Sequence, residues 1–148
     1  MKNANTRILT AFALLGSMAF ASKINAQQPP TDANIGAIVV AANQIDIDYA
    51  KLAISKSQNK DVRAFAEQMV TDHSAVQKSV IELAGKLNLT PVDDATSNGL
   101  KKQSVETTAK LKSLSGDAFD KAYVDNEVAY HKAVTDAVAT VLIPNAQN

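Results

Sequence analysis

Cysteine is absent from this chain of 148 residues. Without thiols the chain can form neither a disulfide framework nor a thiolate metal site, and it lacks the lipid-bearing cysteine of a bacterial lipoprotein. Glycine is also scarce, with five residues in all. No segment alternates polar and apolar residues for long enough to indicate a strand. These absences favour an all-α protein.

Residues 1–26 have the pattern of a secretory signal peptide, with a positively charged start followed by the uncharged run "ILTAFALLGSMAFA". That run is shorter than the roughly 20 residues that span a bilayer. Cleavage is expected after Ala26, with Ala21 as a competing site. Residues 27–148 are then expected to form one exported domain of the bacterial periplasm or outer envelope, with no transmembrane span.

The charge of the exported part is mildly acidic. Removing Lys2, Arg7 and Lys23, and no acid, lowers the 15 basic residues to 12 against 15 acidic ones, so the formal charge becomes −3. A protein that binds nucleic acid needs a basic stripe, and the interspersed charges here provide none. Nucleic acid is therefore excluded as an expected partner.

Three stretches of the chain repeat apolar residues in steps of three and four, which predicts three long amphipathic helices. They cover residues 31–57, 60–88 and 115–142. A weaker pattern at 98–114 predicts a short connector helix. It follows a loop at 88–98 that contains a proline and several turn formers. The expected architecture is an up-down helical bundle.

Capping residues are present at the expected helix ends. Thr31 or Asp32 is expected to cap the first helix, Asn59 the second and Ser115 the last, because short polar side chains accept hydrogen bonds from the free N–H groups there. Pro144 is expected to end the last helix.

Two phrases, "FAEQMVTDH" and "LSGDAFDKAYV" with a later histidine, closely resemble the bacterial envelope proteins of domain-of-unknown-function family 4142. The similarity runs from about residue 35 to residue 141. Members of this family are often labelled outer-membrane proteins. The resemblance implies an exported, ferritin-like four-helix bundle whose biochemical activity is unassigned.

The chain departs from the family pattern at its C-terminal end, where members usually continue into a further helix. The fourth long helix is therefore expected to be missing or truncated, which would leave an apolar groove open to water. A groove of several hundred Å² is normally covered by a partner. A homo-oligomer or a partner helix that completes the bundle is thus one functional alternative.

His73 lies on the apolar seam of the second predicted helix, next to Asp72. Adjacent helical side chains point about 100° apart, so these two are not expected to bind one ion together. The favoured interpretation is structural: a buried neutral imidazole hydrogen-bonds to a carbonyl or carboxylate and fixes the register of the bundle. The protein would then be a binding or structural envelope protein, with neither enzymatic activity nor a cofactor.

The rival interpretation is a ferritin-type metal-binding or oxidative-stress protein. Di-metal bundles of that type use Glu-x-x-His pairs, yet neither Glu67 nor Glu127 is followed by histidine three residues later. Glu127 and His131 do share a helical face, because they are four residues apart.

An aspartate of the first helix would complete such a metal site. Asp46 and Asp48 both flank the apolar seam of that helix, and they are the acids there that can turn inward. The site predicted for iron, zinc or manganese consists of His73, His131, Glu127 and Asp48.

Overall fold

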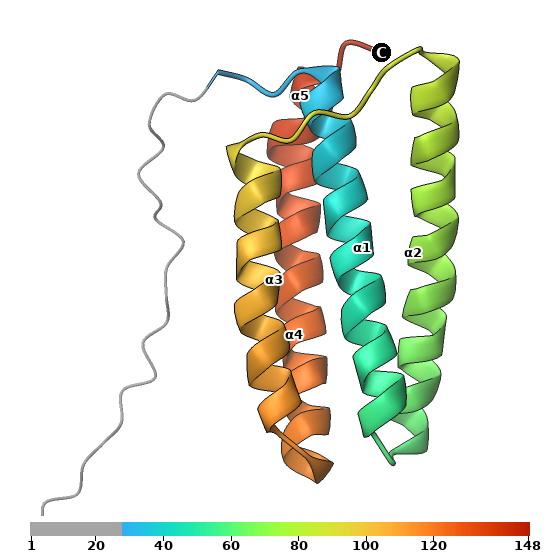
Figure 1. Ribbon diagram of the computed structural model, residues 1–148, viewed down its shortest axis with the longest axis vertical. Helices are drawn as coiled ribbons and strands as arrows, with labels where there is room; N and C mark the ends of the chain where they lie inside the picture. The colour runs from blue at the N-terminus through green and yellow to red at the C-terminus, as the bar shows by residue number, and fades with distance from the viewer. Residues whose placement is uncertain (1–27) are drawn as a thin grey trace, which may run out of the picture.

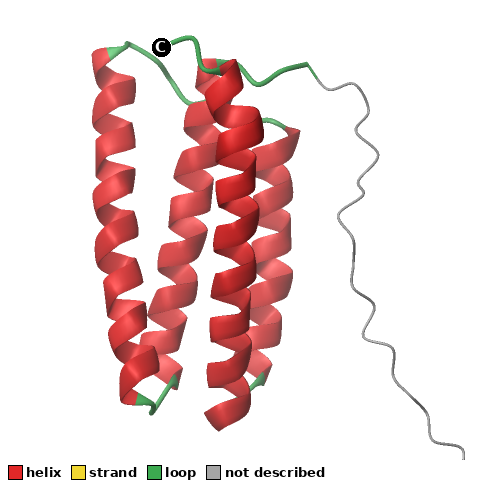
Figure 2. Cartoon of the chain, turned by 180° about the vertical axis from the view of Figure 1, so that it is seen from behind, coloured by secondary structure: helices red, strands yellow, loops and turns green. Residues whose placement is uncertain are grey.

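The computed structural model describes residues 28–148, and the expected signal peptide, residues 1–26, lies outside the described residues. Four long helices run side by side as an up-down bundle (Figure 1), and the part of the chain that is described contains no strand (Figure 2). The helices are α1 (Asp32–Lys56), α2 (Lys60–Lys86), α3 (Ala95–Ser113) and α4 (Gly116–Ala137). The predicted all-α bundle is confirmed. None of the described helices is long and apolar enough to cross a bilayer.

Helix α3 corrects one prediction. In place of a short connector at 98–114, the structure has a helix of 19 residues, so the expectation that a fourth long helix is missing was wrong. Asp94 begins the helix with a capping box: its carboxylate accepts a hydrogen bond from the backbone N–H of Ser97 at 2.8 Å, and the hydroxyl of Ser97 accepts one from the backbone N–H of Asp94 at 3.0 Å. The same polar residues are also turn formers, which is why this stretch was predicted as loop.

The ends of α1 and α2 follow the expected signals. The Thr31 hydroxyl accepts a hydrogen bond from the backbone N–H of Asn34 at 3.3 Å, and the Asn59 side chain accepts two from the first turn of α2. After α2, Asn88 has a φ of 52°, in the left-handed region. There the backbone N–H groups of Asn88 and Leu89 return to carbonyls of the last turn, which closes the helix in a Schellman motif.

The last helix ends at Asn145, one residue beyond the predicted end at Pro144. Helix α4 passes into the π-helical segment η1 (Val138–Leu142), and α5 (Ile143–Asn145) contains the proline. The backbone N–H of Ile143 donates to the carbonyl of Val138, five residues earlier. Proline has no N–H and its ring clashes with the carbonyl four residues before it in a regular α-helix. The wider π turn removes that conflict, so the helical path continues.

Helix α1 is the centre of the bundle, since it packs against each of the other three long helices. The connection from α2 to α3 crosses its N-terminal end (Figure 1). There the backbone N–H of Val92 donates to the Ala33 carbonyl at 3.0 Å, and the Asn34 side chain donates to the Val92 carbonyl at 2.9 Å. This crossing places α3 on the side of α1 away from α2.

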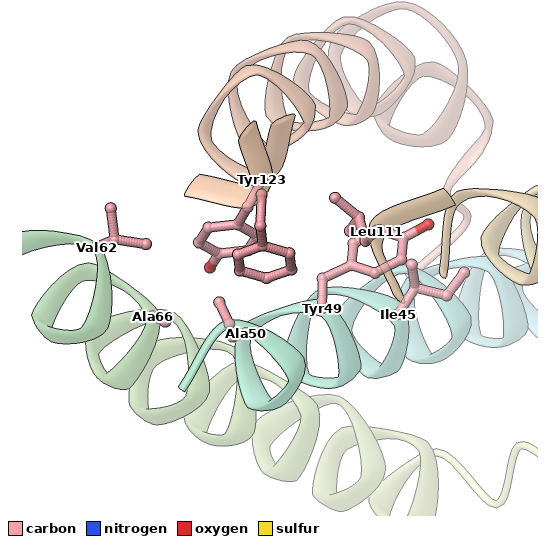
Figure 3. Close-up of a cluster of buried hydrophobic side chains, with 9 residues drawn as sticks. Ile45, Tyr49, Ala50, Val62, Ala66, Leu111 and Tyr123 are labelled. Carbon is pink, nitrogen blue, oxygen red and sulfur yellow. The ribbon is translucent and has the colours of Figure 1, made fainter. Parts of the chain in front are cut away.

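The apolar core fills the end of the bundle where α1 turns into α2 and α3 into α4 (Figure 3). The rings of Phe119 and Tyr123 on α4 lie parallel, with centroids 6.3 Å apart. Alanines 50, 53 and 66 are fully buried, and their small side chains let α1 and α2 approach closely. The nine buried members are Ile45, Tyr49, Ala50, Ala53, Val62, Ala66, Leu111, Phe119 and Tyr123.

If α3 is an integral helix, truncating its buried Leu111 should be costly. We expect Leu111→Ala to lower the free energy of unfolding by about 2–5 kcal/mol, because it leaves a cavity in the core. Val105→Ala on the same helix is the control, since Val105 is 69% exposed, and it should change stability by about 0.5 kcal/mol or less. Urea unfolding followed by circular dichroism measures both. Equal, small effects would contradict the packing of α3.

Candidate metal centre

Three polar side chains from three helices meet just beyond the apolar core. Asp46 comes from α1, His73 from α2 and His131 from α4. Asp46 is buried, with 1% of its surface exposed. The side chains of His73 and His131 are 21% and 40% exposed. The cluster therefore has a closed carboxylate side on α1 and a side open to solvent at His131.

The three side chains direct one atom each toward a common point. The Nε2 atoms of His73 and His131 are 3.3 Å apart. They lie 3.2 Å and 3.4 Å, respectively, from Oδ2 of Asp46. The three atoms thus form a nearly equilateral triangle.

The protonation of His73 is fixed by Asn43. The Asn43 amide nitrogen donates to the backbone carbonyl of Val39 at 2.8 Å, so its oxygen must be the atom that faces His73. That oxygen is 2.9 Å from Nδ1 of His73. An amide oxygen only accepts hydrogen bonds, so Nδ1 carries a proton. In the neutral ring, Nε2 then has a free lone pair.

The protonation of His131 is fixed by the main chain of its own helix. Nδ1 of His131 is 2.9 Å from the backbone carbonyl of Glu127, one turn earlier. A carbonyl oxygen also only accepts, so this Nδ1 carries the proton and Nε2 of His131 is unprotonated in the neutral ring.

Two imidazole lone pairs and one carboxylate oxygen therefore face one another at 3.2–3.4 Å. Three acceptors at this separation repel one another unless a proton or a metal cation lies between them. Metal-binding histidines almost always donate their second ring N–H to a carbonyl or carboxyl group, which orients the ring. Both histidines here have that second bond in place.

The spacing of the three atoms fits a tetrahedral ion. Bonds of about 2.0–2.1 Å in a tetrahedral zinc site place neighbouring ligand atoms about 3.3–3.4 Å apart. Octahedral bonds of about 2.1 Å would place them about 3.0 Å apart. Two imidazoles and one carboxylate, with no thiolate, are also a common zinc donor set.

A comparison with protein families matches residues 17–148 to the family described as Domain of unknown function (DUF4142). The chain belongs to this family. The resemblance of its two sequence phrases to the family is thereby confirmed. Neither the comparison with curated proteins nor the comparison with solved structures found a match.

Of the four predicted site residues of this DUF4142 chain, His73, His131 and Glu127 lie together. Asp48 does not join them: it is exposed, and its carboxylate accepts a hydrogen bond from the Gln44 side chain at 2.9 Å. Its place is taken by Asp46, two residues earlier. Asp46 keeps a spacing of four and three from Ala42 and Tyr49, and this spacing was the signal that could have identified it.

Glu127 lies beside the cluster and is not part of the triangle. Its Oε2 is 3.7 Å from Nδ1 of His131, the ring nitrogen that points away from Asp46. Burial, and then the charge of Asp46, raises the pKa of Glu127 to about 9. Glu127 is therefore a neutral carboxylic acid at pH 7, close enough to Asp46 to share its proton with that carboxylate.

Tyrosines complete the polar surroundings. Burial, and then the charge of Asp46, raises the pKa of Tyr130, and its hydroxyl donates to the backbone carbonyl of Ala42 at 3.1 Å. Burial, and then the charges of Glu127 and Asp46, raises the pKa of Tyr123. Both hydroxyls stay neutral at physiological pH, so Asp46 is the negative charge that the cluster must balance.

The raised pKa of Glu127 predicts how stability changes with pH in protein treated with chelator. Its value is about 4.5 in the unfolded chain and about 9 in the folded one. The folded state therefore binds more protons, and the contribution of Glu127 to stability is complete below pH 4.5 and lost as the pH rises toward 9. Relative to Glu127→Gln, the wild type should become less stable across this range, as measured by urea unfolding.

Glu106→Gln is the matched control, because Glu106 is an exposed glutamate on α3. Its stability should follow the pH dependence of the wild type. Parallel curves for the wild type and Glu127→Gln would show that Glu127 is not buried as a neutral acid.

Proposed function

We propose that this DUF4142 chain binds one divalent transition-metal ion, with zinc as the preferred ion, through Asp46 Oδ2, His73 Nε2 and His131 Nε2. The observation that carries the proposal is the orientation of the two imidazoles. Each donates its Nδ1–H to an oxygen, so both Nε2 lone pairs point at the buried carboxylate. Such partners hold the ring of a metal ligand in the geometry the metal needs before it binds.

The spacing of the donor atoms favours zinc over manganese and iron, because the sites in which iron binds two histidines and one carboxylate are octahedral and would hold these atoms closer together. Manganese prefers oxygen-rich octahedral sites, whereas this triangle has two nitrogens and tetrahedral spacing. The three protein ligands leave the fourth tetrahedral position free. Structural zinc sites usually fill all four positions with side chains, while zinc sites that act on or bind another molecule keep one open. The proposed role is therefore binding of a metal that can accept a further ligand.

The site of action proposed for the protein is the bacterial envelope. The support is the pattern of residues 1–26, with its charged start and uncharged apolar run. An exported protein without cysteine has to bind zinc through imidazole and carboxylate groups, and these are the groups that meet here.

The rival role for the cluster is a structural polar contact in which a proton, not a metal, lies between the three atoms. The two roles differ in metal content. Under the proposal, protein purified without chelator should contain one zinc ion per chain by elemental mass spectrometry, and His73→Ala/His131→Ala should contain none while remaining helical. A well-folded wild type that takes up no zinc, iron or manganese, even when each is added, would contradict metal binding and support the structural role.

Asp46 and Asp48 provide a matched pair that locates the carboxylate ligand. They lie on the same helix, but Asp46 joins the triangle and Asp48 is exposed. Asp46→Asn should weaken zinc binding by at least about 100-fold, because it removes a ligand and its charge. Asp48→Asn should leave the affinity within about twofold. Competition with a zinc-binding dye measures both, and the reverse order would contradict the proposed ligand set.

A further inference from the structure

A groove of about 500 Å³ runs between α2 and α4, beside the metal centre. Apolar side chains form its walls, with Phe65, Val124 and Val128 partly open to solvent at 38%, 39% and 68% exposure. The remaining apolar lining residues are Val62 and Met69. The groove exists because α2 packs along α1 and does not close against α4. It therefore does not arise from a missing helix.

One end of the groove is also the edge of the metal centre. Glu127 and His131 line the groove, and His131 is one of the three ligands of the proposed metal. Glu127 is 1% exposed, and its neutral carboxyl already shares a proton with Asp46. His131, whose side chain is 40% exposed, is therefore the polar group that a bound molecule can reach at this end of the groove.

The groove has the dimensions of a single hydrocarbon chain. It extends from Asp61 to Met69 along α2, which at about 1.5 Å per residue is a length of about 12 Å. An extended chain advances about 1.2 Å per bond, so about ten bonds span it.

The charged groups at the groove determine which polar head group a bound hydrocarbon chain can have. Besides its apolar walls the groove is lined by Asp61, by the neutral carboxyl of Glu127 and by His131, and no lysine or arginine of the described residues lines it. Without a metal, the groove therefore offers an anion no lysine or arginine as a partner. A divalent ion held by two neutral imidazoles and the Asp46 carboxylate leaves a net charge of +1 at the His131 end, which an anionic head group would balance.

We propose that the groove binds a medium-chain carboxylate, with its apolar chain between α2 and α4 and its carboxylate at the end formed by Glu127, His131 and the metal. This inference rests on the proposed metal binding. It names carboxylates as the chemical class of ligand for the coordination position that the three side chains leave open.

The test is calorimetric titration of decanoate into zinc-loaded protein without free zinc, and into protein stripped by chelator. Decan-1-ol, which has the same chain and no charge, is the control ligand. We expect decanoate to bind the zinc-loaded protein at least tenfold more tightly than the stripped protein, while decan-1-ol binds both alike.

Two valines provide matched variants. Val128→Asp places a charge in the groove and should abolish binding of both ligands, whereas Val105→Asp changes an equally exposed valine on α3, at 69%, and should have no effect. Zinc content is measured on every sample. Full zinc content in Val128→Asp would show that the metal centre has remained intact.

The outcomes separate this inference from the function on which it rests. Protein that contains zinc but binds decanoate no better than stripped protein would overturn the inference and leave the metal site standing. Protein that takes up no zinc would overturn both, and the metal analysis reveals this before any ligand is added. A zinc-loaded dimer seen by sedimentation and abolished by Val128→Asp would show that a second copy covers the groove, which also overturns the inference.

Discussion

The buried carboxylate of Asp46 is the constraint on which the centre of this bundle depends. It lies near the middle of α1 with 1% of its surface exposed, and a charge in that position is costly unless it is paired. Helices α2 and α4 each contribute a histidine to it, at 3.2 Å and 3.4 Å. The position of Asp46 therefore couples the packing of three helices to the chemistry of the site.

The apolar core and the candidate metal centre lie at different levels along the bundle. At one end, aromatic rings and small alanines make a close-packed core between the helices. Beyond it lies a polar layer, in which Asn43, Asp46 and Glu127 are all buried. Helix α2 has only Val62 and Ala66 buried among its residues. It packs along α1 and does not close against α4, so the groove between α2 and α4 stays open beside the candidate metal centre.

Much of the fold could be predicted from periodicity and capping residues. Thr31, Asn59 and Asn88 mark helix ends in the sequence as they do in the structure. Helix α3 was underestimated because its few leucines are separated by threonine and serine, and because Asp94 and Ser97 serve turns and helix caps equally well. Pro144 lies within the helical path because a π turn precedes it, and no local sequence pattern predicts that turn.

The candidate site was harder to predict than the fold. His73 stood out because a polar residue on an apolar seam is unusual, and Glu127 and His131 stood out because they lie four residues apart on one helical face. Asp46 and Asp48 both flank the apolar seam of α1, and only the spacing of Asp46 from Ala42 and Tyr49 indicates which of the two faces the interior. The contact between Asn43 and His73 joins residues 30 positions apart on two helices. The periodicity of either helix alone does not predict this contact.

The central claim is that both histidines present an unprotonated Nε2 to the Asp46 carboxylate and bind a metal there. Long-range ¹H–¹⁵N correlation spectra of the imidazole nitrogens test it directly, in stripped protein and after addition of one equivalent of zinc. The account predicts protonated Nδ1 atoms in both rings in both states, with the Nε2 resonances shifting on zinc addition. A ring with its proton on Nε2 and none on Nδ1, or Nε2 resonances that zinc leaves unchanged, would contradict it.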